Sequence, residues 1–206
     1  MESVAPGGLR EPARVAGPAG AGGADVGVDA LGSTVVLGDE LTAVIAAARR
    51  RAYRDGNRHI DTAHLLHTVL ESVPCAAAAF EGGPPQMARV LSYLAQRTIG
   101  YGLNWHGTVE DSGAVPVART GRASWSPAVA AAVARAGDRA TARGARLAQG
   151  FDLFAALTDD RECRAVAVLH GAGVDLEVLA LRLAAESARL AIEAARSDQH
   201  DGPDGD

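Results

Sequence analysis

The sequence predicts an all-α protein that consists of two four-helix units in tandem, related by a pseudo-twofold axis. First, the central part of the 206-residue chain repeats at a constant offset of 88 positions. Second, apolar residues recur at helical spacing in both copies. Third, alanine is abundant and aromatic residues make up only 4% of the chain, which favours close-packed helices over a sheet. The matched positions include Leu41 and Val129, Ala52 and Ala140, Gly56 and Gly144, Leu65 and Leu153, Cys75 and Cys163, Val90 and Val178, and Leu91 and Leu179.

The first copy, residues 37–103, opens with an amphipathic helix. Leu41, Val44 and Ile45 form its apolar face, with arginines on the opposite side. Asp39 has the side chain of an N-cap residue, and Gly56 is typical of a helix C-terminus. This pattern predicts a helix from about residue 39 to residue 55.

Three further helices are predicted in the first copy. Asp61 or Thr62 caps the second helix, and Pro74 breaks it. A short alanine-rich helix then reaches Phe80, and the Gly-Gly-Pro-Pro segment 82–85 predicts a turn before the fourth helix.

The second copy, residues 124–196, has a stronger start signal. Trp125 is an apolar residue before the N-cap, Ser126 is the N-cap, and Pro127 takes the first helical position. The last helix stays amphipathic to about Ala195. The predicted helices cover residues 129–142, 151–157, 164–169 and 175 onward.

Three segments lack helical periodicity. Residues 1–36 are rich in glycine, alanine and proline, and we expect a disordered leader there. Residues 104–123 are turn-rich, which predicts a linker that contains Trp105. Residues 197–206 form an acidic tail.

Composition narrows the possible functions. All 20 basic residues are arginine, and without lysine the chain cannot be a P-loop ATPase or use Schiff-base chemistry. The net charge of −5 disfavours general nucleic-acid binding. One basic cluster stands out, which we interpret as a solvated helix face, with an acidic-ligand or nucleic-acid patch as the alternative. It consists of Arg49, Arg50, Arg51, Arg54 and Arg58.

The sequence also bears on localisation. The start carries acidic Glu2 and no apolar signal core, and no apolar stretch approaches the roughly 20 residues of a membrane span. Two cysteines without an export signal suit a reducing compartment. We therefore expect a cytoplasmic protein.

Three segments resemble one family. The run GNRHIDTAHLL at 56–66 resembles the G-H-N-Y-I-G-T-E-H-L-L signature of the Clp N-terminal (Clp R) domain, found at the front of ClpC- and ClpA-type unfoldases. The run AVAVLHGAGVDLE at 165–177 resembles that family's A-x-x-V-L-x-x-L-G-V-D-L-E, and Trp-Ser-Pro at 125–127 is similar to its F-T-P. The resemblance covers about residues 37–185, and it implies two four-helix repeats.

The resemblance also implies a function. The unfoldases continue into AAA+ ATPase modules, whereas this sequence looks like a stand-alone Clp N-domain protein of the kind found in actinobacteria. The resemblance therefore implies binding of a ClpC-type unfoldase, its adaptors or its substrates. It also implies binding of macrocyclic peptide antibiotics. Some members of the family bind phosphorylated arginine as well.

The phosphoarginine role does not transfer well. The family holds the guanidinium with the Glu of its G-T-E-H motif, and that position is Ala63 in the first copy and Phe151 in the second. Thr62 and His64 of the motif are kept, while the second copy has Gly150 and Asp152 there. We expect an asymmetric groove without that carboxylate.

Trp125 and Leu37 are the candidate groove residues. Each precedes the first helix of its copy, and the resemblance places the Trp125 position beside the groove between the repeats. An exposed aromatic residue in a groove is a typical binding anchor. The alternative is that Trp125 serves only as a hydrophobic staple at the helix start.

The histidines and cysteines give weaker signals. His59, His64 and His67 could support a metal-dependent enzyme, but no acidic or cysteine partner shares their helix face. His64 matches a structural histidine of the family. Cys75 and Cys163 occupy equivalent positions, which favours small packing residues over a nucleophile.

We therefore predict a non-enzymatic binding module without a cofactor. Its groove would hold a peptide, an adaptor or an apolar cyclic peptide, and so modulate a Clp protease or sequester compounds that target its unfoldase. The alternatives are a metal-dependent enzyme that uses the histidine cluster and a helical DNA-binding regulator.

Overall fold

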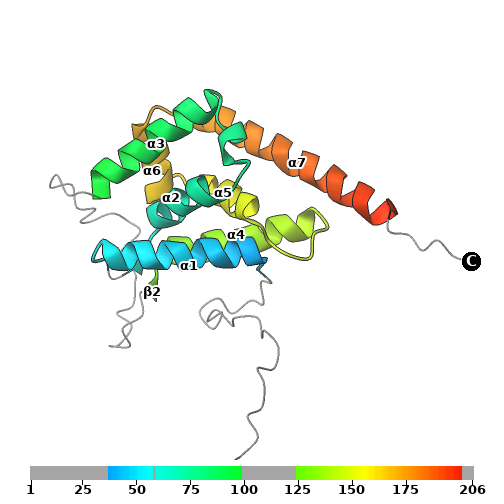
Figure 1. The fold of residues 1–206 in the computed structure, drawn as a ribbon, viewed down its shortest axis with the longest axis horizontal. Coiled ribbons are helices and arrows are strands. Elements are labelled where there is room, and N and C mark those ends of the chain that lie inside the picture. The colour runs from blue at the N-terminus through cyan, green and yellow to red at the C-terminus, as the bar shows by residue number, and fades with distance from the viewer. Residues whose placement is uncertain (1–36, 58, 99–123, 201–206) are drawn as a thin grey trace, which may run out of the picture.

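The computed structural model describes residues 37–57, 59–98 and 124–200. Within these ranges the chain is mostly helical, as the sequence predicts (Figure 1). The expected leader 1–36, the linker 104–123 with Trp105, Arg58, and the last six residues of the expected tail lie outside the described residues.

Helix α1 (Asp39–Arg54) opens the described chain. Its buried face consists of Leu41, Val44, Ile45, Ala48 and Ala52. The N-cap is Gly38 rather than Asp39, because the helix already includes Asp39 in its first turn, where a carboxylate favours the helix dipole. Gly56 follows the helix with a φ of 70°, a left-handed conformation that suits glycine.

Two short helices form the centre of the molecule (Figure 1). Helix α2 (Thr62–Ser72) is buried from Thr62 to Leu70, and helix α5 (Gly150–Asp159) is buried from Gly150 to Thr158. Helices that are buried on all sides need neighbours on all sides. Helix α1 and helix α4 (Pro127–Ala142) cover one side of this pair, while α3 (Gly83–Thr98), α6 (Arg164–Gly171) and α7 (Leu176–His200) cover the other (Figure 1).

The outer elements of the first half differ in detail from the expectation. The alanine-rich segment is a 3₁₀-helix, η2 (Ala76–Ala79). Helix α3 (Gly83–Thr98) begins inside the expected Gly-Gly-Pro-Pro turn. Prolines fit the first turn of a helix because the N–H groups there have no partner within the helix.

The second half closes the core and then extends beyond it. Ser126 caps α4 by accepting a hydrogen bond from the Val129 N–H at 3.2 Å, and Pro127 is the first helical residue, as predicted. Helix α6 (Arg164–Gly171) leads to helix α7 (Leu176–His200), which continues past the expected end at Ala195. The C-terminal half of α7 lies clear of the other helices (Figure 1).

Two short strands were not anticipated. Strand β1 (His59–Ile60) pairs in parallel with strand β2 (Ser124–Trp125), so that His59 lies opposite Ser124 and Ile60 opposite Trp125. An isolated parallel bridge joins Leu37 to Ala148. Two-residue strands carry too little apolar alternation to stand out in a sequence.

Several elements follow the offset of the sequence repeat. Helices α1 and α4 have the same length and begin 88 residues apart. The starts of α2 and α5, and those of η2 and α6, are also 88 residues apart. No helix in the described ranges is long and apolar enough to cross a membrane.

Candidate functional site

The two halves of the chain meet at two junctions of the same construction. At the first junction, the Ser126 N–H donates a hydrogen bond of 2.9 Å to the Ile60 carbonyl beside the Ile60–Trp125 pair. At the second, the Gly38 N–H donates a bond of 3.0 Å to the Ala148 carbonyl beside the Leu37–Ala148 bridge. Leu37 and Ile60 stand 88 positions before Trp125 and Ala148, so each junction repeats the other with the halves exchanged.

The structure does not bring Leu37 and Trp125 together. Leu37 precedes α1, while the strand that pairs with Trp125 follows α1, so the two side chains lie near opposite ends of that helix (Figure 1). The 16 residues of α1 span about 24 Å. Both side chains are half-buried against the core. Each therefore belongs to its own junction rather than to one shared groove.

A buried ion pair joins α2 to α6. Arg164 Nη1 donates to Asp61 Oδ2 at 2.6 Å, and Asp61 is 2% exposed and Arg164 7% exposed. Beside them the Ala165 N–H donates a hydrogen bond of 3.0 Å to Thr62 Oγ1. Burial alone would raise the pKa of Asp61, but the hydrogen bonds and charge of His64, together with the charge of Arg164, lower it below its ordinary value. Asp61 is therefore held as a carboxylate in the core.

The histidine of the motif closes the start of α2. The His64 N–H donates to Asp61 Oδ1 at 2.9 Å, and the Asp61 N–H donates to His64 Nδ1 at 3.2 Å, which makes a reciprocal capping box. Asn57 Nδ2 lies 3.0 Å from His64 Nε2, and Asp55 Oδ2 lies 3.7 Å from the same atom. His64 thus has a structural place at the helix start.

The second half builds the same cap from other residues. Asp152 stands 88 positions after His64, and its Oδ2 accepts a hydrogen bond of 2.9 Å from the Gln149 N–H. Arg143 holds both carboxylate oxygens of Asp152, with Nη2 2.8 Å from Oδ2. The hydrogen bond with Asp152 raises the pKa of Arg143. The partner of the capping residue is therefore acidic Asp55 in one half and basic Arg143 in the other.

Ala63 and Phe151 both lie in the core. Ala63 is buried in α2, and the Phe151 ring packs edge-on against Phe154, with ring centroids 6.4 Å apart. The carboxylates nearest to them in sequence, Asp61 and Asp152, are each bound to an arginine of the same chain. Neither position offers a carboxylate to a guanidinium ligand.

The three histidines of the predicted cluster have separate surroundings. His67 Nε2 lies 3.2 Å from Glu71 Oε1, one helical turn further along α2. The expectation that no acidic residue shares the helix face of the histidines was therefore wrong. His59 lies in strand β1. Burial and the charge of Arg51 lower the pKa of His67. In the described part of the chain, no three His, Cys, Asp or Glu side chains are placed to hold a metal ion.

The two cysteines also differ in their surroundings. Cys163 is buried and its thiol lies 3.4 Å from the Leu157 carbonyl oxygen, while Cys75 is half-buried beside η2. Burial raises the pKa of Cys75, and the charge of Glu40 acts in the same direction. A raised pKa reduces the thiolate fraction that a nucleophile needs.

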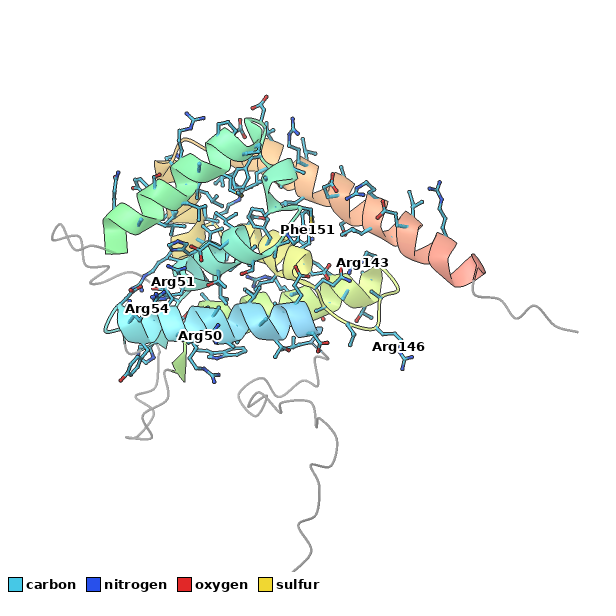
Figure 2. The ribbon with its side chains drawn as sticks, in the orientation of Figure 1. Arg50, Arg51, Arg54, Arg143, Arg146 and Phe151 are labelled. Carbon is cyan, nitrogen blue, oxygen red and sulfur yellow. The ribbon has the colours of Figure 1, made fainter. Side chains whose placement is uncertain are left out.

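The basic cluster divides into paired and unpaired arginines. Arg51 bonds Glu71 at 2.5 Å, and the equivalent Arg139 bonds Asp159 at 2.7 Å. Figure 2 shows Arg50, Arg51 and Arg54 toward one end of α1. Arg50 and Arg54 are exposed, and no described carboxylate lies within ion-pair distance of either.

An open hollow occurs away from both junctions. It has a volume of about 460 Å³ and lies where α6 ends and α7 begins. Arg161, whose Nη2 bonds Glu177 Oε1 at 2.6 Å, lines it together with His170 and Asp175. Asp175 caps α7 by accepting from the N–H groups of Glu177 and Val178.

Sequence reasoning missed Arg164, which pairs with Asp61 from 103 positions away. An arginine that follows a cysteine in an otherwise apolar segment gave a weak signal of burial, but nothing in the sequence named its partner. Sequence reasoning also missed the partner of Glu40, whose Oε2 accepts a hydrogen bond of 3.4 Å from the Gly150 N–H at the start of α5.

The comparisons with known proteins agree on the fold. No protein-family model and no curated protein matches this chain. Among solved structures, the N-terminal domain of ClpD, the caseinolytic protease associated chaperone of Arabidopsis thaliana, matches with a TM-score of 0.54 and 13% identity, over 76% of this chain and 98% of that one. A chain from preliminary structural investigations of a malarial protein secretion system matches with a TM-score of 0.53 and 13% identity, over 73% and 94%. This chain has a Clp N-terminal domain-like fold.

Proposed function

We propose that this protein is a non-enzymatic, Clp-related binding module whose two halves are a tandem repeat. Three pairs of elements that begin 88 residues apart support the repeat, as do two junctions that exchange the halves. The fold supports the binding role, because it is shared with the N-terminal domain of a Clp chaperone.

The observation that carries the site is the half-buried tryptophan at the first junction. Trp125 pairs with Ile60 in the two-stranded sheet and is partly buried against the core. A rigidly held aromatic residue that keeps part of its ring in solvent can anchor an apolar ligand at low entropic cost. We therefore place the ligand beside Trp125, with Leu37 as a second, separate contact at the other junction.

The proposed ligands are a peptide segment of a ClpC-type unfoldase, of its adaptor or of its substrate, or an apolar cyclic peptide. The protein would act in the cytoplasm, either as a modulator of a Clp protease or as a decoy for compounds aimed at the unfoldase. Phosphoarginine is not among these ligands, because Asp61 and Asp152 are bound to Arg164 and Arg143.

Calorimetric titration with a macrocyclic peptide that targets Clp unfoldases tests the decoy role. We expect binding by the wild-type protein and a loss of at least tenfold in affinity for Trp125→Ala, because truncation removes the anchor. Tyr53→Ala is the matched control, since Tyr53 is an exposed aromatic residue in the last turn of α1, near the same end of that helix, but it is not part of the β1–β2 pair that holds Trp125. The absence of heat at tens of micromolar would contradict this role.

A further inference from the structure

Helix α7 carries an apolar stripe that the rest of the described chain does not cover. Leu181 is 72% exposed and Ile192 is 53% exposed. Eleven residues correspond to about three helical turns, so the two side chains lie on one line along the helix. Between them on the same face stand Ala185 and Ala188, both exposed. The opposite face of α7, with Leu179 and Leu183, is buried in the core.

The order of large and small residues along the stripe is symmetric about its midpoint. Leu181 and Ile192 are placed symmetrically about the point between Glu186 and Ser187, and so are Ala185 and Ala188. When two such helices run antiparallel across a twofold axis through this point, small residues meet at the centre and large ones at the ends. Small residues allow a close approach where two helices cross, and larger residues fill the space where they diverge.

The charges beside the stripe fit the same arrangement. Arg182 and Glu193 are also eleven residues apart and share one flank of the stripe. Arg182 is exposed, and no carboxylate of the described residues is paired with it. Glu193 bonds Arg189 of its own helix at 2.7 Å. An antiparallel partner would place this Glu193 within about 3 Å along the axis of Arg182, which would then join the existing pair. In a parallel twofold pair the two copies of this flank would lie on opposite sides of the contact, so that Arg182 and the partner's Glu193 would not meet.

The overall shape leaves room for this contact. The C-terminal half of α7 lies clear of the other helices, so a second copy can approach it without meeting the body of the molecule (Figure 1). Twofold symmetric pairing buries the same patch on both subunits and closes the assembly at two copies.

We infer that the stripe of Leu181, Ala185, Ala188 and Ile192 on α7 is the interface of an antiparallel homodimer of this protein. An interface of one helix pair is at the small end of specific interfaces, below about 1,200 Å² in total, so we expect a weak dimer that forms reversibly. This inference concerns a different surface from the Trp125 junction, and either can fail without the other.

Cysteine cross-linking tests both the partner and its direction. In the proposed pairing, position 181 faces position 192 of the partner, while two copies of position 181 are about 16 Å apart. We therefore expect Leu181→Cys and Ile192→Cys chains to form disulfide-linked dimers when they are mixed, and neither chain alone to do so. The wild-type chain measures the background from Cys75 and Cys163.

Sedimentation velocity completes the experiment. The wild-type protein should shift with concentration from the chain mass of 21.0 kDa toward twice that mass. Leu181→Glu should remain monomeric, and Tyr53→Glu, an equally exposed control on α1, should still dimerise. Arg182→Glu should weaken the dimer, and Arg182→Glu combined with Glu193→Arg should restore it. Cross-links in the single-variant samples, or a wild-type protein that stays monomeric at every concentration, would overturn the inference.

Discussion

The ion pair between Asp61 and Arg164 should be one of the most sensitive points in the fold. Its two charged atoms lie 2.6 Å apart, and both side chains are almost fully buried. Removing one member of a buried pair leaves an uncompensated charge and costs about 3 to 5 kcal/mol. His64 remains bonded to Asp61, so we expect Arg164→Met to lose about 3 kcal/mol, at the lower end of that range.

Asp61→Asn measures the loss of stability when the acidic member of the ion pair is removed instead. Asparagine caps helices as well as aspartate does, so this change keeps the start of α2 and removes only the charge. We expect a loss of about 3 kcal/mol again, because Arg164 is then buried without its counter-ion. The double variant, Asp61→Asn with Arg164→Met, should lose much less stability than the two single variants together, since it leaves no unpaired charge in the core.

Arg161→Met is the matched control. Arg161 makes an ion pair with Glu177 at the same distance of 2.6 Å, but both side chains are exposed. An exposed pair contributes at most about 1 kcal/mol. Urea denaturation followed by circular dichroism gives the free energy of unfolding of all four variants. A loss for Arg164→Met no larger than that for Arg161→Met, or a strictly additive double variant, would refute the reasoning.

Three further predictions concern stability. Gly150→Ala should cost at least about 1 kcal/mol in urea denaturation, because a Cβ there would lie 2.5 Å from Val73 Cγ2; a neutral result would show that α2 and α5 can separate freely. Phe154→Ala should cost about 3 to 5 kcal/mol, since its ring is fully buried against Phe80 and Phe151, and a loss below that of an exposed change such as Tyr53→Ala would contradict the packing. His67 has a lowered pKa in the folded state, so the unfolded chain binds more protons below about pH 6.5 and stability should fall as the pH drops through that value. His67→Gln should flatten this part of the stability–pH curve, and an unchanged slope would exclude His67 as its source.

Much of the fold was predictable because the outer helices are amphipathic and several helices are marked at their ends. Ser126 and Pro127 predicted the start of α4 to the residue, and Gly56 predicted the end of α1. Three pairs of elements begin 88 positions apart, which is the offset seen in the sequence, while the repeat itself stays a prediction. The all-α interpretation did not foresee β1 and β2, because two-residue strands are held by long-range backbone bonds rather than by a local pattern.

The site was less predictable, because it depends on which distant residues meet. Leu37 and Trp125 were predicted to be equivalent positions, and only the structure shows that α1 separates them. His64 was correctly interpreted as structural, since its cap is local in sequence. Arg164 could not be assigned to Asp61, because nothing local encodes a contact across 103 positions. The ligand roles of Trp125 and Leu37 stay predictions.

The central claim is that the Trp125 junction holds a Clp-related partner. Pull-down from an extract of the source cell, with Clp unfoldase and adaptor peptides quantified by mass spectrometry, tests it most directly. We predict that the wild-type protein and Tyr53→Ala both enrich a Clp unfoldase or its adaptor, and that a folded Trp125→Ala protein, checked by circular dichroism, does not. Equal recovery with all three proteins, or no Clp component with the wild-type protein, would contradict the account.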